Sequence, residues 1–497
     1  MAKYNTENIK NLYWANNAGF KRGRDPMGIQ NCSIVIYGIL LPGLTNQTER
    51  LRYYSFYCWL LYEYEKECEK TTENGTLIDL YNYIRRAELT MAFLMDGRGI
   101  KSVVGSQHIS QQEYGTTKEG YYDIKSSADL NAYPSQKKYW ANPTGAFGQN
   151  YLGSLVYLEL VENNEGSIVL KNRGRYLAES FINSVDEKSR NLFLQYVRKG
   201  CLPPKDIARM ESLCLDKIIH KSQEWSLLND IITNEDLNGS TFRKDTISLM
   251  LDTYRKGVEI EQFPKTMFLK YESGSSETVL GWHYYYLCEA LHYSIETIFW
   301  MILDNASKNN YLPIGDFMSL CANCIISGFS QSDSSKKLSE TMTMFKSSKE
   351  EIVERLNNLI SLVNDDDSKK ASSKAVELLV CIYKIVMMNR EVYFSFENNH
   401  KINLQFGNAN SFAKRYVGNN IDLKVDAFVR NVIKMVMTDH VTSACRKMGN
   451  GQLDLRKFLI EDGRIVFVEM RWPQFTNPRT GSLFSFLEDL SIIKKDK

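Results

Sequence analysis

The stretch YLGSLVYLELVENNEGSIVLKNRGRYLAESF, residues 151–181, changes its hydrophobic period twice and decides the local fold. Apolar residues first recur at helical spacing, and a short strand then begins at Leu160-Val161. A polar turn follows, and residues 168–170 return as a β-branched partner strand. Asn172 is a residue type that caps helices, and it precedes a second amphipathic segment. We therefore expect helix, hairpin and helix, with a core of Leu155, Val156, Leu160, Ile168, Leu170 and Leu177.

This order of elements resembles the end of a winged helix-turn-helix. In that class of bacterial regulators, a helix is followed by a Leu-Gly-Leu-Val corner and by a Leu-Thr-x-x-Gly-Arg strand exit. The corresponding residues here are Leu158-Glu159-Leu160-Val161 and Leu170-Lys171-Asn172-Arg173-Gly174-Arg175. The chain departs from the pattern in having Glu159 for the corner glycine and Lys171 for the capping threonine. The resemblance covers residues 148–181 and implies one winged-helix-like module.

Two uses of this module stay open. In DNA-reading members of the class, the helix before the hairpin enters the major groove. That helix has no Arg or Lys on its polar face here, and the turn carries Glu162 and Glu165, which phosphates would repel. The basic residues of the module are Lys171, Arg173 and Arg175. The module therefore either binds nucleic acid through these three residues or serves as a packing or protein-contact element.

The densest basic cluster lies elsewhere. Lys21, Arg22 and Arg24 form a basic loop, and Arg50 and Arg52 precede a helix in which tyrosines interleave. Cations next to aromatic rings are typical of nucleic-acid surfaces. The alternative is that these cations are solvated and the aromatic rings are buried under the helix. If nucleic acid binds at all, we expect this cluster to be the stronger site.

Composition favours a globular, mainly helical protein. Of 497 residues, 43% are hydrophobic and 24% charged, and the net charge is +2, so a polyanion would have to bind a local patch. The 10 cysteines are scattered through apolar runs, which is not the pattern of a disulfide-rich secreted protein. We see no signal peptide and no apolar run long enough to span a membrane. We therefore expect a cytoplasmic protein with reduced thiols and no membrane partner.

The expected fold class is mainly α, a multi-domain helical protein with small β-hairpins. We divide it into residues 1–205, containing the winged-helix-like module, a helical core at 206–364, and a C-terminal α+β region at 375–497. The boundary is the charged stretch 364–374, NDDDSKKASSK, which has the composition of a linker. Residues 1–45 are expected to be irregular to extended.

Two further expectations concern segments within these regions. The apolar segment that starts at Trp282 is hydrophobic on most of its circumference and predicts a central, buried helix. A helix from Val425 to Met448, a strand at 464–468 and a last helix after Pro478 resemble the winged-helix order more weakly. A second such module at the C-terminus is therefore kept as an alternative.

The segment EDGRIVFVEMRW, residues 461–472, is the sharpest enzymatic candidate. Restriction-type nucleases hold Mg²⁺ with two carboxylates and use a lysine on the second strand. Asp462, Glu469 and Arg471 imitate this order, but arginine does not exchange protons as the lysine must. A plain hairpin with solvent-facing charges explains the same residues.

A zinc site is the other chemical candidate. Cys321 and Cys324 have metal-ligand spacing, and Cys288 and His292 lie on the preceding apolar helix. We prefer to interpret all four as core residues, because cysteines that are not in disulfides behave as small apolar side chains. No phosphate-binding glycine loop and no nucleophile elbow occur. We therefore expect no catalytic residue, no metal ligand and no cofactor.

The function we expect is that of a non-enzymatic subunit of a multi-protein complex, engaging nucleic acid or acting as a scaffold. In general type, the chain is similar to accessory proteins of bacterial antiphage defence systems. The partners expected are DNA or RNA, and a protein partner or further copies of this chain. Two alternatives stay open, a divergent metal-dependent nuclease using Asp462 and Glu469, and a purely structural oligomerisation protein.

Overall fold

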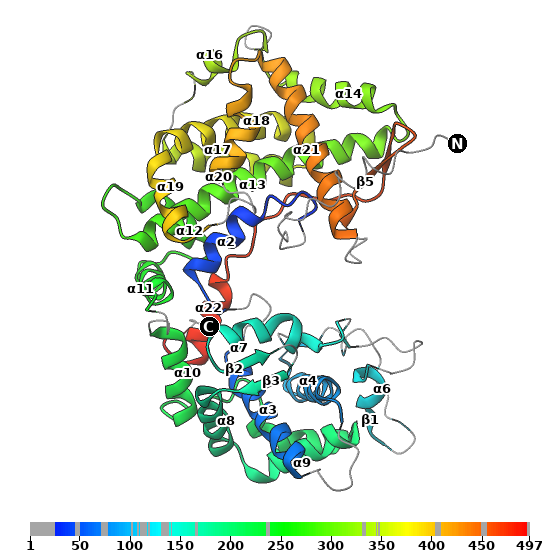
Figure 1. The fold of residues 1–497 in the computed structure, drawn as a ribbon, viewed down its shortest axis with the longest axis vertical. Coiled ribbons are helices and arrows are strands. Elements are labelled where there is room, and N and C mark those ends of the chain that lie inside the picture. Colours follow the sequence, from blue (N-terminus) through cyan, green and yellow to red (C-terminus); the bar gives the residue numbers. More distant parts are fainter. Residues whose placement is uncertain are drawn as a thin grey trace. The chain divides into compact units, whose positions relative to one another are not determined.

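The chain forms two compact units, and each is discontinuous in sequence. Unit 1 contains residues 1–40 and 262–476, and unit 2 contains residues 41–261 and 477–497 (Figure 1). The fold is seen in a computed structural model. The residues that it describes are 25–44, 50–70, 78–100, 103–106, 109, 117, 120–130, 139–140, 142–164, 167–234, 239–330, 334–343, 345, 348–402, 409–448 and 455–494.

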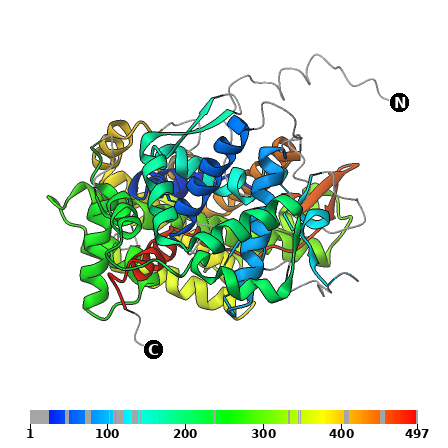
Figure 2. The same ribbon diagram turned by 90° about the horizontal axis from the view of Figure 1, so that it is seen from below.

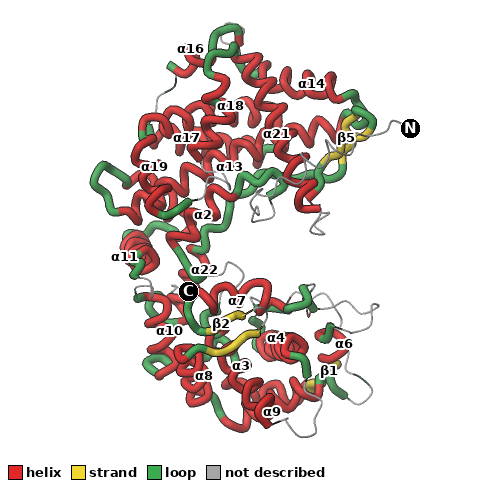
Figure 3. The backbone as a smooth tube through the Cα atoms, viewed as in Figure 1, coloured by secondary structure: helices red, strands yellow, loops and turns green. Residues whose placement is uncertain are grey.

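The mainly helical fold class is confirmed. Within the described residues, strands form only three two-stranded antiparallel sheets, and helices make up most of both units (Figure 3). Two of these sheets are hairpins, and the third pairs β1 (Tyr122–Asp123) with β4 (Cys201–Leu202). The sheets are too small to form a core of their own, so the helices provide the packing.

Unit 1 is built around the helix α13 (Glu277–Lys308). Ser276 caps its first turn, because its side chain accepts a hydrogen bond from the Val279 amide. Almost every residue from Thr278 to Leu303 is buried, as expected for a helix that is apolar on all sides. The prediction of a central buried helix is confirmed. The helices that pack on it include α2 (Asn31–Leu40), α12 (Phe263–Lys270), α18 (Ser368–Met388) and α21 (Val425–Met448).

Smaller elements complete unit 1. They are α14 (Ile314–Ile326), α16 (Leu338–Met342), α17 (Lys349–Asn364), α19 (Arg390–Asn399), α20 (Ala409–Tyr416), η5 (Gly418–Asn420), β5 (Phe458–Glu461) and β6 (Arg464–Phe467). The β5–β6 hairpin lies at the edge of unit 1 (Figure 1), and its orange-red strands can be followed by colour in Figure 2. Its two-residue turn is Asp462-Gly463, with φ of 48° and 71°, the backbone that a twisted hairpin prefers.

Unit 2 has an aromatic core between α3 (Tyr53–Lys70) and α8 (Asn172–Ser184). The ring of Trp59 lies 5.2 Å from that of Phe181. The other elements are α4 (Leu80–Asp96), α6 (Ile124–Ala128), η1 (Phe147–Tyr151), α7 (Leu152–Tyr157), β2 (Val161–Asn164), β3 (Ser167–Leu170), α9 (Glu187–Lys199), η2 (Pro204–Leu213), α10 (Gln223–Thr233), α11 (Phe242–Arg255), η3 (Ile260–Gln262, which ends on the first residue of unit 1) and α22 (Thr480–Asp489).

The expected helix, hairpin and helix are all present in residues 148–181. Val161 pairs with Leu170 across β2 and β3, and α8 follows directly. Glu159, which stands where the resemblance has a glycine, adopts a left-handed backbone with φ of 54°. Leu155, Leu160, Leu170 and Leu177 are buried as predicted. The prediction was wrong for Val156, which is 40% exposed, and Ile168 is half-buried near the turn.

Two segment predictions are wrong. Residues 31–40, expected to be irregular or extended, form α2 against α13. The expected linker continues into a helix, because Asp367 caps α18 and Ala371, Ser372 and Ser373 are buried in it. Small side chains allow close packing there, and the Ser373 hydroxyl donates to the Ile325 carbonyl at 2.9 Å. The polar stretch 364–374 therefore contains the buried start of α18 and is not a linker.

The division into units differs from the three expected regions. The expected boundaries, near residue 205 and at 364–375, both fall inside units, and the observed crossings lie at 40/41, 261/262 and 476/477. The elements considered for a second winged-helix-like module are also divided. α21, β5 and β6 belong to unit 1, whereas α22 belongs to unit 2.

Candidate functional site: a buried carboxylate–histidine cluster

Three ionisable side chains lie in the middle of α13. Glu289, His292 and Glu296 are three and four residues apart, so they lie along one face of the helix. Each is at most 3% exposed. Ionisable groups are rarely buried without a partner, because the loss of water costs several kcal/mol per ion. This cluster therefore requires a physical explanation.

The contacts of His292 are too long for hydrogen bonds. Its Nδ1 lies 3.7 Å from Glu289 Oε1, and its Nε2 lies 3.5 Å from Glu296 Oε1. Neither ring nitrogen has a hydrogen-bond partner among the described residues, and neither does Glu289 Oε1. A buried polar atom left in this state costs about 1–3 kcal/mol. The geometry thus leaves both ends of the imidazole available for a ligand or a proton.

A third carboxylate comes from the far end of the sequence. Asp25 precedes α2 and is fully buried, and its oxygens accept the Met27 and Gln30 amides, each at 2.7 Å. Asp25, His292 and Glu296 each place one potential ligand atom within 4.8 Å of the others. Among the described residues, this is the one group of three or more His, Cys, Asp or Glu side chains with that geometry. We call these three residues, with Glu289, the α13 cluster.

His440 of α21 is another of the buried imidazoles of unit 1, which also include His283. Its Nε2 accepts the Lys457 amide at 3.2 Å, and its ring lies 4.8 Å from Phe299. Burial lowers the pKa of His440 to about 4, so the ring is neutral at pH 7. His292 and His440 are therefore in opposite electrostatic environments.

The carboxylates also hold a segment of extended chain, residues 468–476, which we call the strap. Arg471 Nη2 donates to Glu296 Oε1 at 3.0 Å, and the Gln474 amide donates to Glu296 Oε2 at 2.8 Å. The Thr476 amide donates to Glu289 Oε2 at 2.6 Å. At the other end of the strap, Lys457 Nζ pairs with Glu469 Oε2 at 2.5 Å. The strap is therefore fixed to α13 although it is neither helix nor strand.

Three of the exposed side chains of the strap are apolar, and they lie beside the exposed polar residues Glu469 and Gln474. Val468 is 46% exposed, Trp472 51% and Phe475 45%. The Phe475 ring stacks on Tyr293 of α13, with 4.5 Å between centroids. Aromatic side chains such as Trp and Phe are enriched in protein–protein interfaces.

The charge of the cluster favours a cation. Burial opposes protonation of His292, but the charge of Glu296 and the neighbouring Glu289 raise the pKa of His292 well above its usual range. Three carboxyl groups, from Asp25, Glu289 and Glu296, lie around one imidazole, with Arg471 as a basic neighbour.

The predicted nucleic-acid residues before α3 are engaged elsewhere. Arg52 is fully buried and forms an ion pair with Glu224, so it is unable to contact a phosphate. This corrects the prediction for Arg52. Arg50 pairs with Asp489 at 2.9 Å and is partly exposed. Lys21, Arg22 and Arg24 lie outside the described residues.

The basic residues of the hairpin module are also paired with carboxylates. Lys171 lies 3.5 Å from Glu159, Arg173 lies 3.4 Å from Asp230, and Arg175 lies 2.7 Å from Glu65. Exposed ion pairs of this kind are weak, yet each carboxylate offsets the field that a phosphate would meet. The module therefore does not present an uncompensated basic surface.

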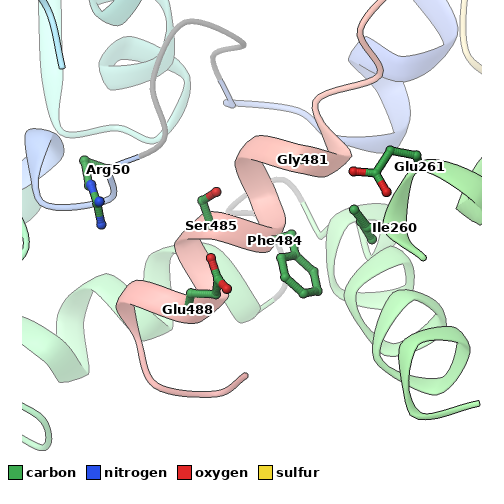
Figure 4. A pocket seen from close by; sticks show the side chains of 7 residues that line it. All are labelled: Arg50, Ile260, Glu261, Gly481, Phe484, Ser485 and Glu488. Carbon is green, nitrogen blue, oxygen red and sulfur yellow. The ribbon is translucent and has the colours of Figure 1, made fainter. Parts of the chain in front are cut away.

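Arg50 lies beside a hollow of about 280 Å³ in unit 2 (Figure 4). Ser485 and Phe484 of α22 line it, and Arg50 and Glu261 lie at opposite ends of the view. Glu488 adds a second carboxylate. With two acidic groups and one basic group, the hollow has no charge preference for a phosphate.

The candidate nuclease residues do not come together. Asp462 is in the hairpin turn, and Glu469 lies in the strap, beyond the end of β6. Arg471, the supposed catalytic cation, is bound to Glu296 instead. The cysteines also remain apart from a common site, because Cys324 Sγ contacts Asn305 Oδ1 at 3.8 Å and Cys288 accepts from Cys32 through its carbonyl.

Sequence reasoning named His292 but missed Asp25, Glu289 and Glu296. The available signal was the pair of glutamates flanking a histidine within an otherwise apolar helix. The contribution of Asp25 depends on packing between segments more than 260 residues apart, and no local pattern marks it.

Comparison with known proteins identifies no relative. No protein-family model, no curated protein and no solved structure matches the chain. The winged-helix and defence-system resemblances therefore stay predictions. No helix in the described part of the chain is both long and apolar enough to cross a bilayer.

Proposed function

We propose that the chain is a non-enzymatic scaffolding protein that associates with a second copy of itself through the strap. The observation that carries the proposal is the exposure of Trp472 and Phe475 on a segment whose backbone is fixed by buried carboxylates. Trp is the residue most typical of binding hot spots, where a few aromatic anchors contribute most of the free energy.

Rigidity supports this role. Binding by a mobile segment loses free energy to ordering, about 0.5–1.5 kcal/mol for each immobilised flexible side chain. The strap is already ordered by the contacts to Glu289 and Glu296, and the Tyr285 hydroxyl donates to the Thr476 carbonyl at 2.8 Å. The backbone that carries Trp472 is therefore ordered before a partner binds.

Electrostatics favour a protein over a nucleic acid. The described basic residues proposed for phosphate binding are paired with carboxylates, and Glu469 on the strap is exposed. With a net charge of +2 over 497 residues, two copies repel each other little. A two-fold contact then pairs Val468, Trp472 and Phe475 of one strap with the same residues of the second copy, which closes the assembly as a dimer.

The test is the molar mass in solution, measured by light scattering during gel filtration over a range of concentrations. Wild type is expected to be a dimer, and Trp472→Ala to shift it to a monomer. Tyr176→Ala is the matched control, because Tyr176 is an aromatic residue of unit 2 that is 60% exposed. The control is expected to remain a dimer.

A monomeric wild type at all concentrations contradicts the proposal, as does a Trp472→Ala variant that dimerises normally. Fluorescence anisotropy with labelled DNA and RNA is run on the same samples. If the wild type is a monomer and binds DNA or RNA in a salt-sensitive way, and if Trp472→Ala does not change this binding, the protein binds nucleic acid and is not a scaffold.

A further inference from the structure

We propose that Asp25, His292 and Glu296 form a binding site for one divalent transition-metal ion, of which Zn²⁺ and Mn²⁺ are the probes, and that Glu289 positions His292. This inference does not depend on the scaffolding function. It rests on three buried ligand-type side chains within 4.8 Å of one another and on an imidazole without hydrogen-bond partners among the described residues.

The spacing of the ligand atoms fits a metal ion better than direct hydrogen bonds. Ligand atoms bound to a tetrahedral ion at about 2.0–2.1 Å lie roughly 3.4 Å apart. His292 Nε2 and Glu296 Oε1 are 3.5 Å apart, which is beyond hydrogen-bond distance and close to this value. A carboxylate oxygen of Asp25, in the segment before α2, lies within 4.8 Å of the ligand atoms of His292 and Glu296. Asp25 therefore supplies the third ligand.

Glu289 is placed to orient the imidazole. Its Oε1 lies 3.7 Å from His292 Nδ1, on the side of the ring opposite to Glu296. A metal-bound histidine commonly donates its second N–H to a carboxylate, which fixes the tautomer and the ring plane. The 3.7 Å separation would have to shorten for this hydrogen bond to form. Glu289 is therefore a positioning residue and not a ligand.

The residue types around the site also suit a cation. Three carboxyl groups, from Asp25, Glu289 and Glu296, surround one imidazole, and Arg471 is a basic side chain that contacts Glu296. The combination of one imidazole and two carboxylates is a ligand set used for zinc and manganese.

Such an ion would join three distant parts of unit 1. Asp25 precedes α2, His292 and Glu296 lie on α13, and Glu296 also holds Arg471 and Gln474 of the strap. Metal binding therefore stabilises the folded state of unit 1 by an amount that depends on ion concentration.

The first measurement uses the full chain without a histidine tag, purified without chelator. Elemental analysis is expected to give about one equivalent of zinc or manganese. After removal of the metal with a chelator, addition of ZnCl₂ or MnCl₂ is expected to raise the Tm and restore the original content.

Variants then assign the site. His292→Gln and Asp25→Asn are expected to abolish stoichiometric binding, and Glu289→Gln to weaken it about 10–100-fold. His283→Gln is the matched control, since His283 is a buried imidazole on the same helix that is 3.0 Å from the Phe268 carbonyl and 2.9 Å from the Tyr393 hydroxyl. It is expected to lose stability but to keep its metal.

Substitution with Co²⁺ distinguishes this site from a cysteine site without any variant. Thiolate ligands give cobalt an intense near-ultraviolet absorption, and nitrogen and oxygen ligands do not. The spectrum is expected to show only the weak visible bands of an N/O site. A thiolate band, a wild type that binds neither ion, or equal metal content in wild type and His292→Gln each overturns the proposal.

Discussion

Arg52 and Glu224 form a fully buried, two-point ion pair in unit 2. Arg52 Nε donates to Glu224 Oε1 at 2.9 Å, and Nη2 donates to Oε2 at 3.0 Å. Arg52 Nη1 also donates to the carbonyls of Ser212 and Cys214, at 2.9 and 2.8 Å. Glu224 accepts further bonds from Ser55 and Ser184. All three guanidinium nitrogens of Arg52 therefore donate hydrogen bonds within the protein.

Removal of either partner should therefore destabilise unit 2 strongly. We expect Glu224→Gln and Arg52→Ala each to lower the free energy of unfolding by about 3–5 kcal/mol, because the remaining group is buried without its partner. Urea denaturation followed by circular dichroism measures the change. Arg255→Gln is the control, since Arg255 and Asp252 form an exposed pair at 3.4 Å, and it should cost less than about 1 kcal/mol. An equal loss in the control and the two variants would contradict the assignment.

Asp489 should make the stability of unit 2 depend on pH. Burial raises the pKa of Asp489 to about 6, although the Leu51 amide and Arg50 oppose the shift. Between about pH 4 and 6, the folded state therefore holds a proton that the unfolded chain has released, and stability falls as pH rises through this window. The contribution lost is roughly 3 kcal/mol.

Asp489→Asn removes this titration but keeps an acceptor for the Leu51 amide. We expect the difference in unfolding free energy between wild type and the variant to change across pH 4–6 and to be flat above pH 7. Denaturation at a series of pH values measures it. A constant difference from pH 4 to pH 8 is the result that refutes a raised pKa.

Gly174 should be intolerant of a side chain. A Cβ at this position would lie 2.0 Å from the Leu160 carbonyl oxygen, and backbone on both sides would have to move. We expect Gly174→Ala to cost about 1–3 kcal/mol, as overpacking usually does. Gly153→Ala is the matched control, because a Cβ there meets no atom within 4 Å and alanine favours the helix α7. Thermal unfolding compares the two variants, and equal Tm values would rule out this packing.

Local patterns predicted the elements around Gly174 well. The change of period at Leu160 and the polar turn after it specify a hairpin, and both effects act over a few residues. The same holds for α13, whose apolar circumference requires a covering of other helices. Such features depend on composition and spacing alone.

The burial of Arg52 and the position of Asp25 could not be predicted in this way. Arginine is usually exposed, and the partner of Arg52 lies 172 residues away in the sequence. Asp25 lies close to His292 and Glu296 only because α2 packs on α13. The prediction of a linker at 364–374 was wrong because composition does not reveal tertiary packing. Serine and alanine are suited both to a loop and to the tightly packed start of a helix.

The last prediction is that Asp462 and Glu469 form no nuclease site. Asp462 is in the β5–β6 turn, whereas Glu469 follows the end of β6 and pairs with Lys457. The six residues of extended chain from 464 to 469 span roughly 16 Å, but two carboxylates that share a metal ion have oxygens only about 4 Å apart. Incubation of wild type with single- and double-stranded DNA and RNA, with Mg²⁺ or Mn²⁺, should therefore leave the substrates intact on a gel. Cleavage that Asp462→Asn and Glu469→Gln both abolish, while Glu461→Gln in the neighbouring strand does not, would establish the nuclease in place of the scaffold.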